Sequence, residues 1–593
     1  MDPNSGPSQV IFDEVLYQPA PPSVQLQMQQ QHVDLLMNSE EDFSDSDFEV
    51  DIVVDSDHDS RSEQSEDDDV PTAVSSEEGY YSNTQWSEEQ PVVVTKPHID
   101  FELKLPGLRP PAKELGLYIE PITAWEFIFG DAMLKNIILY TNRKLAKTRK
   151  KSMNPNRTEL RECCEFEVRA FLGLLLYSGV FRSNHENISA LFATDGTGRD
   201  IFRAVLSAKR FQVLLLCLRF DNCEDREQRK LMDKGTAVSE LIKSFNDNSQ
   251  AVFSIGSCAN IDEMLIECSG PCSFRMYMAN RGDKYGLKMQ CLTDARNNYA
   301  YNVYLYTGKG SDGFGLNADE KLYSAPTQAA IRLCKPIIGT DINVTTDTWY
   351  TSMELVEVLK VYGLTCVGTL KKHSPDIPTQ FLPSRSRSVG SAIYSANKDT
   401  VIVSHVPKKG KSVILLSSMH RSEKEDDKPE HVLSYYNATK SGVKNLDGKC
   451  AAYSCSRRTR RWSMAVFFKI IDMSAVNAHI IHQSYVENRQ STRVDFMRTL
   501  AKQLVTPYME TRMTNPNLPR ELRTTIQRIL GVTIEMRDVD LDKLPREERK
   551  ICFVCPAKKR RKTCYLCCNC KRPVCLECSR KICLNCTMVD EDL

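Results

Sequence analysis

The feature that most constrains the fold of this chain is a run of paired cysteines near its end. Ten of the 22 cysteines lie between Cys552 and Cys586, and eight of them follow the spacing C-x2-C-x11-C-x2-C-x4-C-x2-C-x4-C-x2-C. Each CxxC pair supplies two thiolates to a tetrahedral Zn²⁺, so four pairs predict two structural zinc ions. In so short a segment the metals, rather than an apolar core, must make the domain fold.

The predicted zinc ligands are Cys552, Cys555, Cys567, Cys570, Cys575, Cys578, Cys583 and Cys586. Cys564 and Cys568 are left over, and Cys564 forms a competing CxxC with Cys567, so the division of ligands between the two ions stays open. The first residues, MDPNSGPSQVIFDE, lack the basic and apolar regions of an export signal, and the longest apolar run, AFLGLLLYSGVF, is shorter than the ~18 residues of a membrane span. We therefore expect a soluble, non-secreted protein with reduced thiols and no membrane partner.

Charge divides the chain into an acidic arm and a basic body. Residues 1–100 hold 24 Asp and Glu against two basic residues; subtracting these from the 77 basic and 78 acidic residues of the whole chain leaves 75 and 54. The composition of the arm predicts disorder over 1–105, and its Ser–acidic repeats suit an acid-directed kinase. A basic body suits a polyphosphate partner such as double-stranded DNA, because neutralised phosphates release counterions; the alternative is a solvated positive surface.

The spacing of apolar residues changes along the body. It is helical over 115–256, then takes on the short runs of strands joined by a crossover helix, as in CANIDEMLIEC, YGLKMQCLTD and TTDTWYTSMELVEVLK, and later returns to a helical period. This pattern predicts an α/β core between helical segments. The predicted parts are helices over 115–256, core over 257–370, an insertion over 371–431, core over 432–455, helices over 456–535, a linker over 536–551 and the cysteine-rich zinc domain over 552–586.

Two aspartates stand at awkward places for a charge. Asp262 lies between apolar neighbours in a strand-like run, and Asp347 directly follows the strand NVTT. Carboxylates that are far apart in sequence but meet in space hold the divalent ions of phosphoryl-transfer sites. The alternatives are an edge-strand acid facing solvent for Asp262 and a helix N-cap near Thr351 for Asp347.

The order of four motifs resembles that of the piggyBac family of transposases. The segments are IDEMLIECSGPCSFRMYMANRGDKYGLKM, TTDTWYTSMELVEVLK with VGTLKK, YYNATKSGVKNLD, and CSRRTRRW, and the resemblance extends from about 115 to 535 and into the cysteine tail. It implies an RNase H-like catalytic core of the DDE class with an insertion domain, flanked by all-α DNA-binding and dimerisation segments, and a C-terminal cross-brace zinc domain. Family members cut at terminal inverted repeats and insert at TTAA, and are expected to act as homodimers.

The resemblance makes Asp262 and Asp347 the first two members of an aspartate triad that binds Mg²⁺ or Mn²⁺. The third belongs to a Gly-Gly-Val-Asp-x-x-Asp pattern, which here reads SGVKNLD, so that Lys444 stands in the triad position and the later acid, Asp447, remains. An ammonium in place of a carboxylate beside divalent cations should weaken metal binding sharply, since a unit charge pair 4 Å apart is worth about 4 kcal/mol at an effective dielectric of about 20.

Basic residues near these motifs are the predicted DNA contacts. They are Arg275, Lys284, Lys288, Arg457, Arg458, Arg460 and Arg461. Guanidinium groups bind phosphate in a bidentate way, although a solvated surface is the alternative for each. A second departure from the family lies nearby, where Ser269 and Pro271 replace the arginines of an Arg-Gly-Arg element.

The cysteine tail carries the remaining predictions. By resemblance to cross-brace domains, one zinc would be held by Cys552, Cys555, Cys575 and Cys578, and the other by Cys567, Cys570, Cys583 and Cys586. The basic run Lys558, Lys559, Arg560, Arg561 and Lys562 fits a nuclear localisation signal and a phosphate-binding patch equally well. Two hypotheses follow: a domesticated, transposable element-derived DNA-binding protein of the nucleus with impaired cleavage, or an active cut-and-paste transposase that uses Asp262, Asp347 and Asp447.

Overall fold

The computed structural model describes residues 104–579, apart from 153–155, 278–284, 373, 375–376, 398–399, 421–428, 533–543, 545, 557 and 568–570. Residues 1–103 of the arm predicted over 1–105 and part of the linker lie outside these residues. The chain divides into two compact units. The first comprises residues up to Ile188 together with Lys209–Val505, and the second comprises Ser189–Ala208 together with the residues from Thr506 onward.

A nine-stranded mixed sheet forms the centre of the first unit. Its middle strand β3 (Cys258–Glu267) pairs antiparallel with β5 (Tyr285–Asp294) and parallel with β7 (Asn343–Thr346). On the outer sides, β6 (Ala300–Leu305) pairs with β5, and β8 (Thr365–Thr369) runs parallel to β7. The order β6-β5-β3-β7-β8, with two parallel joins after two antiparallel ones, is an RNase H-like core, so the predicted fold class is confirmed.

The strands predicted from YGLKMQCLTD and CANIDEMLIEC are the most deeply packed. Nine of the ten residues of β5 are buried, as expected for a strand that is covered on both faces. Helix α11 (Met353–Val361) is the crossover helix that the sequence pattern predicted. The structure adds α10 (Ala325–Cys334), which the pattern did not reveal. The short β4 (Met276–Tyr277) pairs with the start of β5.

The segment 371–431, predicted to be an insertion with a few strands, continues the central sheet. It supplies β9 (Ala392–Ala396), β10 (Val401–Lys408) and β11 (Lys411–Ser417), and β11 pairs antiparallel with β8. The three strands extend the main sheet. Without β11, strand β8 would be an edge with unpaired N–H and C=O groups. Within the described residues these strands therefore do not form a sheet of their own.

The predicted helical stretch at 115–256 is helical in the structure. Its principal helices are α2 (Pro121–Ile128), α3 (Asp131–Lys151), α4 (Glu165–Val180), α7 (Ala208–Cys217), α8 (Arg226–Lys230) and α9 (Thr236–Val252). After the sheet come α12 (Pro429–Thr439), α13 (Gly442–Ala452), α14 (Trp462–Gln483) and α15 (Arg493–Met513).

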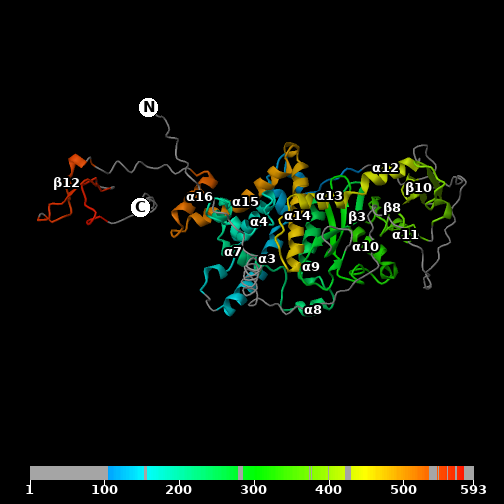
Figure 1. Cartoon of the computed structure of the whole chain (residues 1–593), viewed down its shortest axis with the longest axis horizontal. Helices are drawn as coiled ribbons and strands as arrows, with labels where there is room; N and C mark the ends of the chain where they lie inside the picture. The colour runs from blue at the N-terminus through cyan, green and yellow to red at the C-terminus, as the bar shows by residue number, and fades with distance from the viewer. Residues whose placement is uncertain are drawn as a thin grey trace, which may run out of the picture. The chain divides into compact units, whose positions relative to one another are not determined.

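Helix α14 is the core helix of the first unit. It packs against α2, α9 and α13, and in Figure 1 α13 and α14 lie beside β3. It is long and apolar enough to cross a membrane by length and composition, but 83% of its most apolar window is buried inside the protein. The burial accounts for its composition, because a helix that is apolar all round fits the middle of a large core.

The second unit contains α6 (Asp200–Val205) and α16 (Arg520–Leu530), which pack together. Arg512 donates to the carbonyls of Arg203 and Ala204, and Arg203 forms an ion pair with Glu521. Farther along, β12 (Lys550–Ile551) and β13 (Lys562–Thr563) form a two-residue ladder next to the cysteines. This ladder is too small to be stable without further support.

Candidate functional site

Strand β3 places Asp262 inside the sheet. Because β3 lies between β5 and β7, the alternative of an edge-strand acid is wrong; the Asp262 side chain is half-buried, and its Oδ1 accepts the N–H of Glu263 at 2.8 Å. The register pairs Ile261 with Thr346, so that Asp262 and Asp347 are the next residues along two adjacent parallel strands. The sheet thus brings together two acids that are 85 residues apart, as the sequence predicted.

Asp347 turns back on its own backbone at the end of β7. Its Oδ1 accepts the N–H of Trp349 at 3.0 Å, whereas the N-cap of α11 is Ser352, whose hydroxyl accepts the N–H of Leu355. The alternative of an N-cap role for Asp347 is therefore wrong. Burial and the nearby Glu263 carboxylate raise the pKa of Asp347 to about 7, so this acid carries less negative charge near neutral pH than an exposed one.

A buried ion pair lies on the other face of β3. The Nζ of Lys288 is 3.6 Å from Oε2 of Glu263 and 4.2 Å from the ring centre of Trp349, and both charged side chains are almost fully buried. Next to them, the hydroxyl of Tyr350 donates to Oε1 of Gln290. The prediction that Lys288 contacts DNA is wrong, because its ammonium is enclosed between a carboxylate and an indole ring.

Helix α13 carries the third acidic position and begins against β3. The N–H of Val443 donates to Oδ1 of Asn260 at 2.8 Å. A Cβ atom on Gly442 would lie 2.6 Å from Oγ1 of Thr293 and 2.9 Å from Cβ of Asn260. The glycine therefore permits the close approach that fixes α13 on the face of the sheet where Asn260 and Asp262 lie.

We expect Gly442→Ala to lower the free energy of unfolding by about 1–3 kcal/mol, because the added methyl overpacks a close helix–strand contact. The matched control is Gly448→Ala in the same helix, where an added Cβ meets nothing within 4 Å. This change should raise the free energy of unfolding by about 0.5–1 kcal/mol, because alanine favours a helix over glycine. Urea unfolding of the two variants measures the difference. Equal effects would contradict the assigned role of Gly442.

Lys444 and Asp447 have different environments on α13. Lys444 is exposed, whereas Asp447 is partly buried and its Oδ1 accepts a hydrogen bond from Nζ of Lys469 on α14 at 2.5 Å. Burial alone would lower the pKa of Lys469, but Cys450 and Asp447 raise it overall, so the ammonium of Lys469 keeps its charge. The acid that survives in the family pattern is thus already bound to a cation from within the chain.

The three aspartates do not form one compact group of ligand atoms in this arrangement. Among the described residues, the group of three or more metal-ligating side chains with all ligand atoms within 4.8 Å of one another consists of cysteines and includes none of these acids. Carboxylates that share an ion would lie about that close. The ion pair with Lys469 also competes with Mg²⁺ or Mn²⁺ for the carboxylate of Asp447.

The arginines of SRRTRRW divide into structural and exposed ones. Arg457 is buried and donates to the carbonyls of Ser183 at 2.9 Å and Glu186 at 2.6 Å, so the prediction that it contacts DNA is wrong. Arg461 donates to the carbonyls of Leu215, Leu216 and Leu218 at and just beyond the end of α7, a capping role that uses its guanidinium within the protein. Arg458 and Arg460 are exposed, so a DNA contact by these two residues stays a prediction.

Another predicted DNA contact, Arg275, lies beside the loop 269–272. Arg275 is half-buried, stacks on Tyr285 at 4.9 Å and donates to the carbonyls of Ser269 and Gly270, so it holds this loop. A DNA contact by Arg275 stays a prediction. Lys284 lies outside the described residues.

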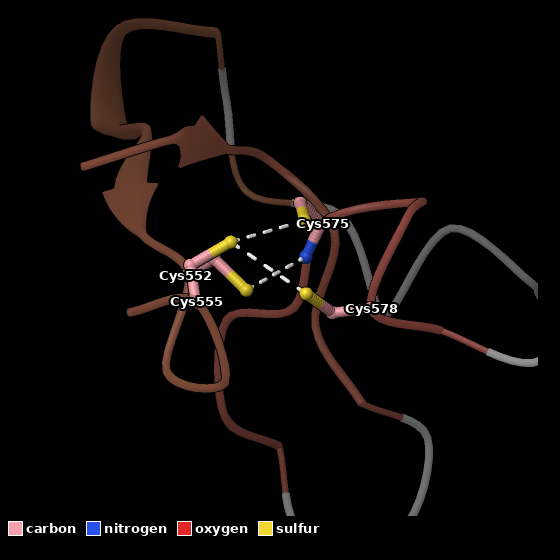
Figure 2. Close-up of side chains that lie close together, drawn as sticks. All are labelled: Cys552, Cys555, Cys575 and Cys578. Carbon is pink, nitrogen blue, oxygen red and sulfur yellow. Dashed lines mark hydrogen bonds between the residues drawn. The ribbon is translucent and has the colours of Figure 1, made fainter. Parts of the chain in front are cut away.

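Four cysteines of the tail converge on one point (Figure 2). They are Cys552, Cys555, Cys575 and Cys578. The sulfur of Cys555 is 3.6 Å from that of Cys575 and 3.5 Å from that of Cys578, close to the roughly 3.8 Å that tetrahedral Zn²⁺ with ~2.3 Å bonds sets between its ligands. Desolvation would raise the pKa of the Cys552 thiol, but backbone N–H groups, including that of Cys575, lower it to about 6.

This group fits Zn²⁺ and matches the first ligand set that the resemblance implied. Of the second set, Cys570, Cys583 and Cys586 lie outside the described residues, as does the spare Cys568. Cys564 and Cys567 are described and lie outside the group of four. Close by, Lys558, Lys559, Arg560 and Lys562 are exposed, whereas Arg561 forms an ion pair with Glu577.

An RNase H-like sheet with one acid within β3, another directly after the adjacent strand β7 and a third on a following helix defines a DDE-type transposase fold. A family model described as Transposase IS4 matches residues 120–479, more than half of the chain. A solved structure, the "Cryo-EM structure of piggyBac transposase synaptic complex with hairpin DNA", is 31% identical, covers 81% of this chain and 99% of that chain, and superposes with a TM-score of 0.67. The chain therefore belongs to the piggyBac-type transposase family, whose DDE chemistry uses divalent metal ions.

The structure adds two residues to the acidic region that sequence reasoning missed. Glu263 follows Asp262 directly, and the alternation of a strand was enough to place it on the opposite face, against Lys288. Lys469 stands inside the apolar run MAVFFKII, where a charge is unusual. That isolated lysine signalled a buried partner, but the run did not say which acid it would meet.

Proposed function

We propose that this chain is a DNA-binding protein of the piggyBac-type family that recognises transposon-end-like DNA with impaired strand cleavage. The observation that carries the proposal is the state of the third acid: Lys444 stands in the triad position, and Asp447 is bound to Lys469 at 2.5 Å. Metal ligands must be deprotonated and available to the ion, and here the remaining third carboxylate is held by an ammonium from within the chain.

The DNA-binding part of the proposal rests on retained architecture. The core, the exposed Arg458 and Arg460, and a four-cysteine group that fits zinc are all present. The similar solved transposase is in a complex with DNA. The proposal includes two structural zinc ions, a homodimer, a nuclear location directed by the basic run 558–562, and a kinase acting on the acidic arm.

The test pairs an excision assay with a binding assay. We expect the wild-type protein to excise a reporter flanked by piggyBac-type terminal repeats and TTAA no better than the Asp262→Ala variant does. Both proteins should bind the repeat DNA in a gel shift, with an affinity that falls steeply as salt rises.

The active alternative makes the opposite prediction. If Asp262, Asp347 and Asp447 hold Mg²⁺ in the presence of DNA, excision by the wild-type protein will exceed that by Asp262→Ala, and Asp447→Ala will abolish it. That result would overturn impaired cleavage. Loss of repeat binding in the folded wild-type protein would overturn the DNA-binding proposal itself.

A further inference from the structure

Lys469 brings a buried positive charge to the acidic face of the sheet. It lies in the core helix α14, and its side chain is 12% exposed, compared with 32% for its partner Asp447 on α13. The bond between Nζ and Oδ1 is 2.5 Å long. A charge at this depth is costly to bury unless it is paired, so the packing of α14 on α13 holds the ammonium against this carboxylate.

The charge of Lys469 also reaches the side of the sheet that carries the first acid. Cys291 on β5 pairs in register with Asp262, and its buried thiol feels the charges of Lys469, Asp447 and Asp262 together. The charges of these three groups therefore act on the same buried side chain of β5.

The other acid near Lys469 is already committed. Asp472 lies one turn farther along α14, where its carboxylate accepts the hydroxyl of Ser454 at 2.8 Å and the N–H of Cys455 at 2.9 Å. These bonds hold the segment that follows α13. Asp447 therefore remains the carboxylate to which Lys469 donates.

Building on the proposed function, we infer that Lys469 is a resident cation of the acidic site. Its ammonium supplies, beside Asp447, the positive charge that a divalent ion supplies where three carboxylates meet. Two lysines, rather than one, then oppose metal binding at this site: Lys444 and Lys469. In a Lys444→Asp variant, the ammonium of Lys469 would still be bonded to the carboxylate of Asp447.

Mn²⁺ binding to the full-length, zinc-loaded protein without DNA tests this inference, with electron paramagnetic resonance to count the free ion. We expect Lys444→Asp/Lys469→Met to bind Mn²⁺ at least tenfold more tightly than Lys444→Asp. The matched control is Lys444→Asp/Lys449→Met. Like Lys469, Lys449 is a partly buried lysine, but it lies on α13 and donates to the carbonyl of Asn297. Its Mn²⁺ affinity should stay within about threefold of that of Lys444→Asp.

Equal Mn²⁺ affinities of Lys444→Asp and Lys444→Asp/Lys469→Met would overturn the inference, and so would an equal gain in the Lys449 control. If the methionine variant does not fold, Lys444→Asp/Lys469→Gln replaces it, because glutamine keeps a donor for Asp447 without the charge. The comparison is independent of excision by the wild-type protein. An active wild type would refute the proposed function, whereas the Mn²⁺ comparison alone decides the role of Lys469.

Discussion

Removal of zinc is expected to unfold the C-terminal module while the RNase H-like unit keeps its structure. The module around Cys552, Cys555, Cys575 and Cys578 contains a ladder of two residue pairs, and the hydrophobic residues that it buries are Cys552 and Cys575 themselves, as far as the structure describes it. Structural zinc binding contributes about 10–16 kcal/mol in zinc-finger peptides at neutral pH, so its loss exceeds any stabilisation that this small ladder can provide.

Limited proteolysis of the full chain, with and without a zinc chelator, measures this effect. We expect chelation to expose sites in 550–579 to rapid cleavage and zinc to restore protection. The variant Cys555→Ser should behave like the chelated protein. Cys564→Ser is the matched control, because this described thiol lies outside the four-cysteine group and its replacement should preserve protection. Protection that is indifferent to both zinc and Cys555 would contradict a metal-dependent fold.

The second large effect is expected at Glu167 on α4. Its carboxylate is almost fully buried and accepts two bonds from the Arg210 guanidinium, at 3.0 and 2.7 Å, and a third from Arg161 at 2.7 Å. The Glu167→Ala change removes the charge that balances buried Arg210, and breaking such a pair costs about 3–5 kcal/mol. Urea unfolding of the intact protein should show this loss of stability.

Glu165→Ala is the control for this pair. Glu165 lies on the same helix and pairs with Arg169 at 2.9 Å, but its side chain is 43% exposed, so its removal should cost less than about 1 kcal/mol. Similar losses for the two variants would show that burial does not set the strength of the Glu167–Arg210 pair. Glu167→Gln, which keeps acceptor and shape but not charge, should fall between them.

Much of the site was predictable because short-range rules governed it. Asp262 and Asp347 stood in strand-like contexts, and parallel strands bring such positions together. The CxxC pairs predicted thiolate ligands for the same reason: two residues between cysteines allow both sulfurs to reach one ion. By contrast, the DNA contacts predicted for Lys288 and Arg457 were wrong, since sequence shows that a side chain is basic but not whether a carboxylate or carbonyl lies within reach.

The sequence by itself determined the α/β core, the helical segments around it, the cysteine ligands and the lysine at 444. Each depends on periodicity or spacing within a few residues. Only the tertiary structure decided that the strands of 371–431 extend the main sheet, that α14 occupies the core, and that Lys469 meets Asp447. These outcomes depend on which segments pack together across long stretches of chain, and buried charges take their partners from that packing rather than from their neighbours in sequence.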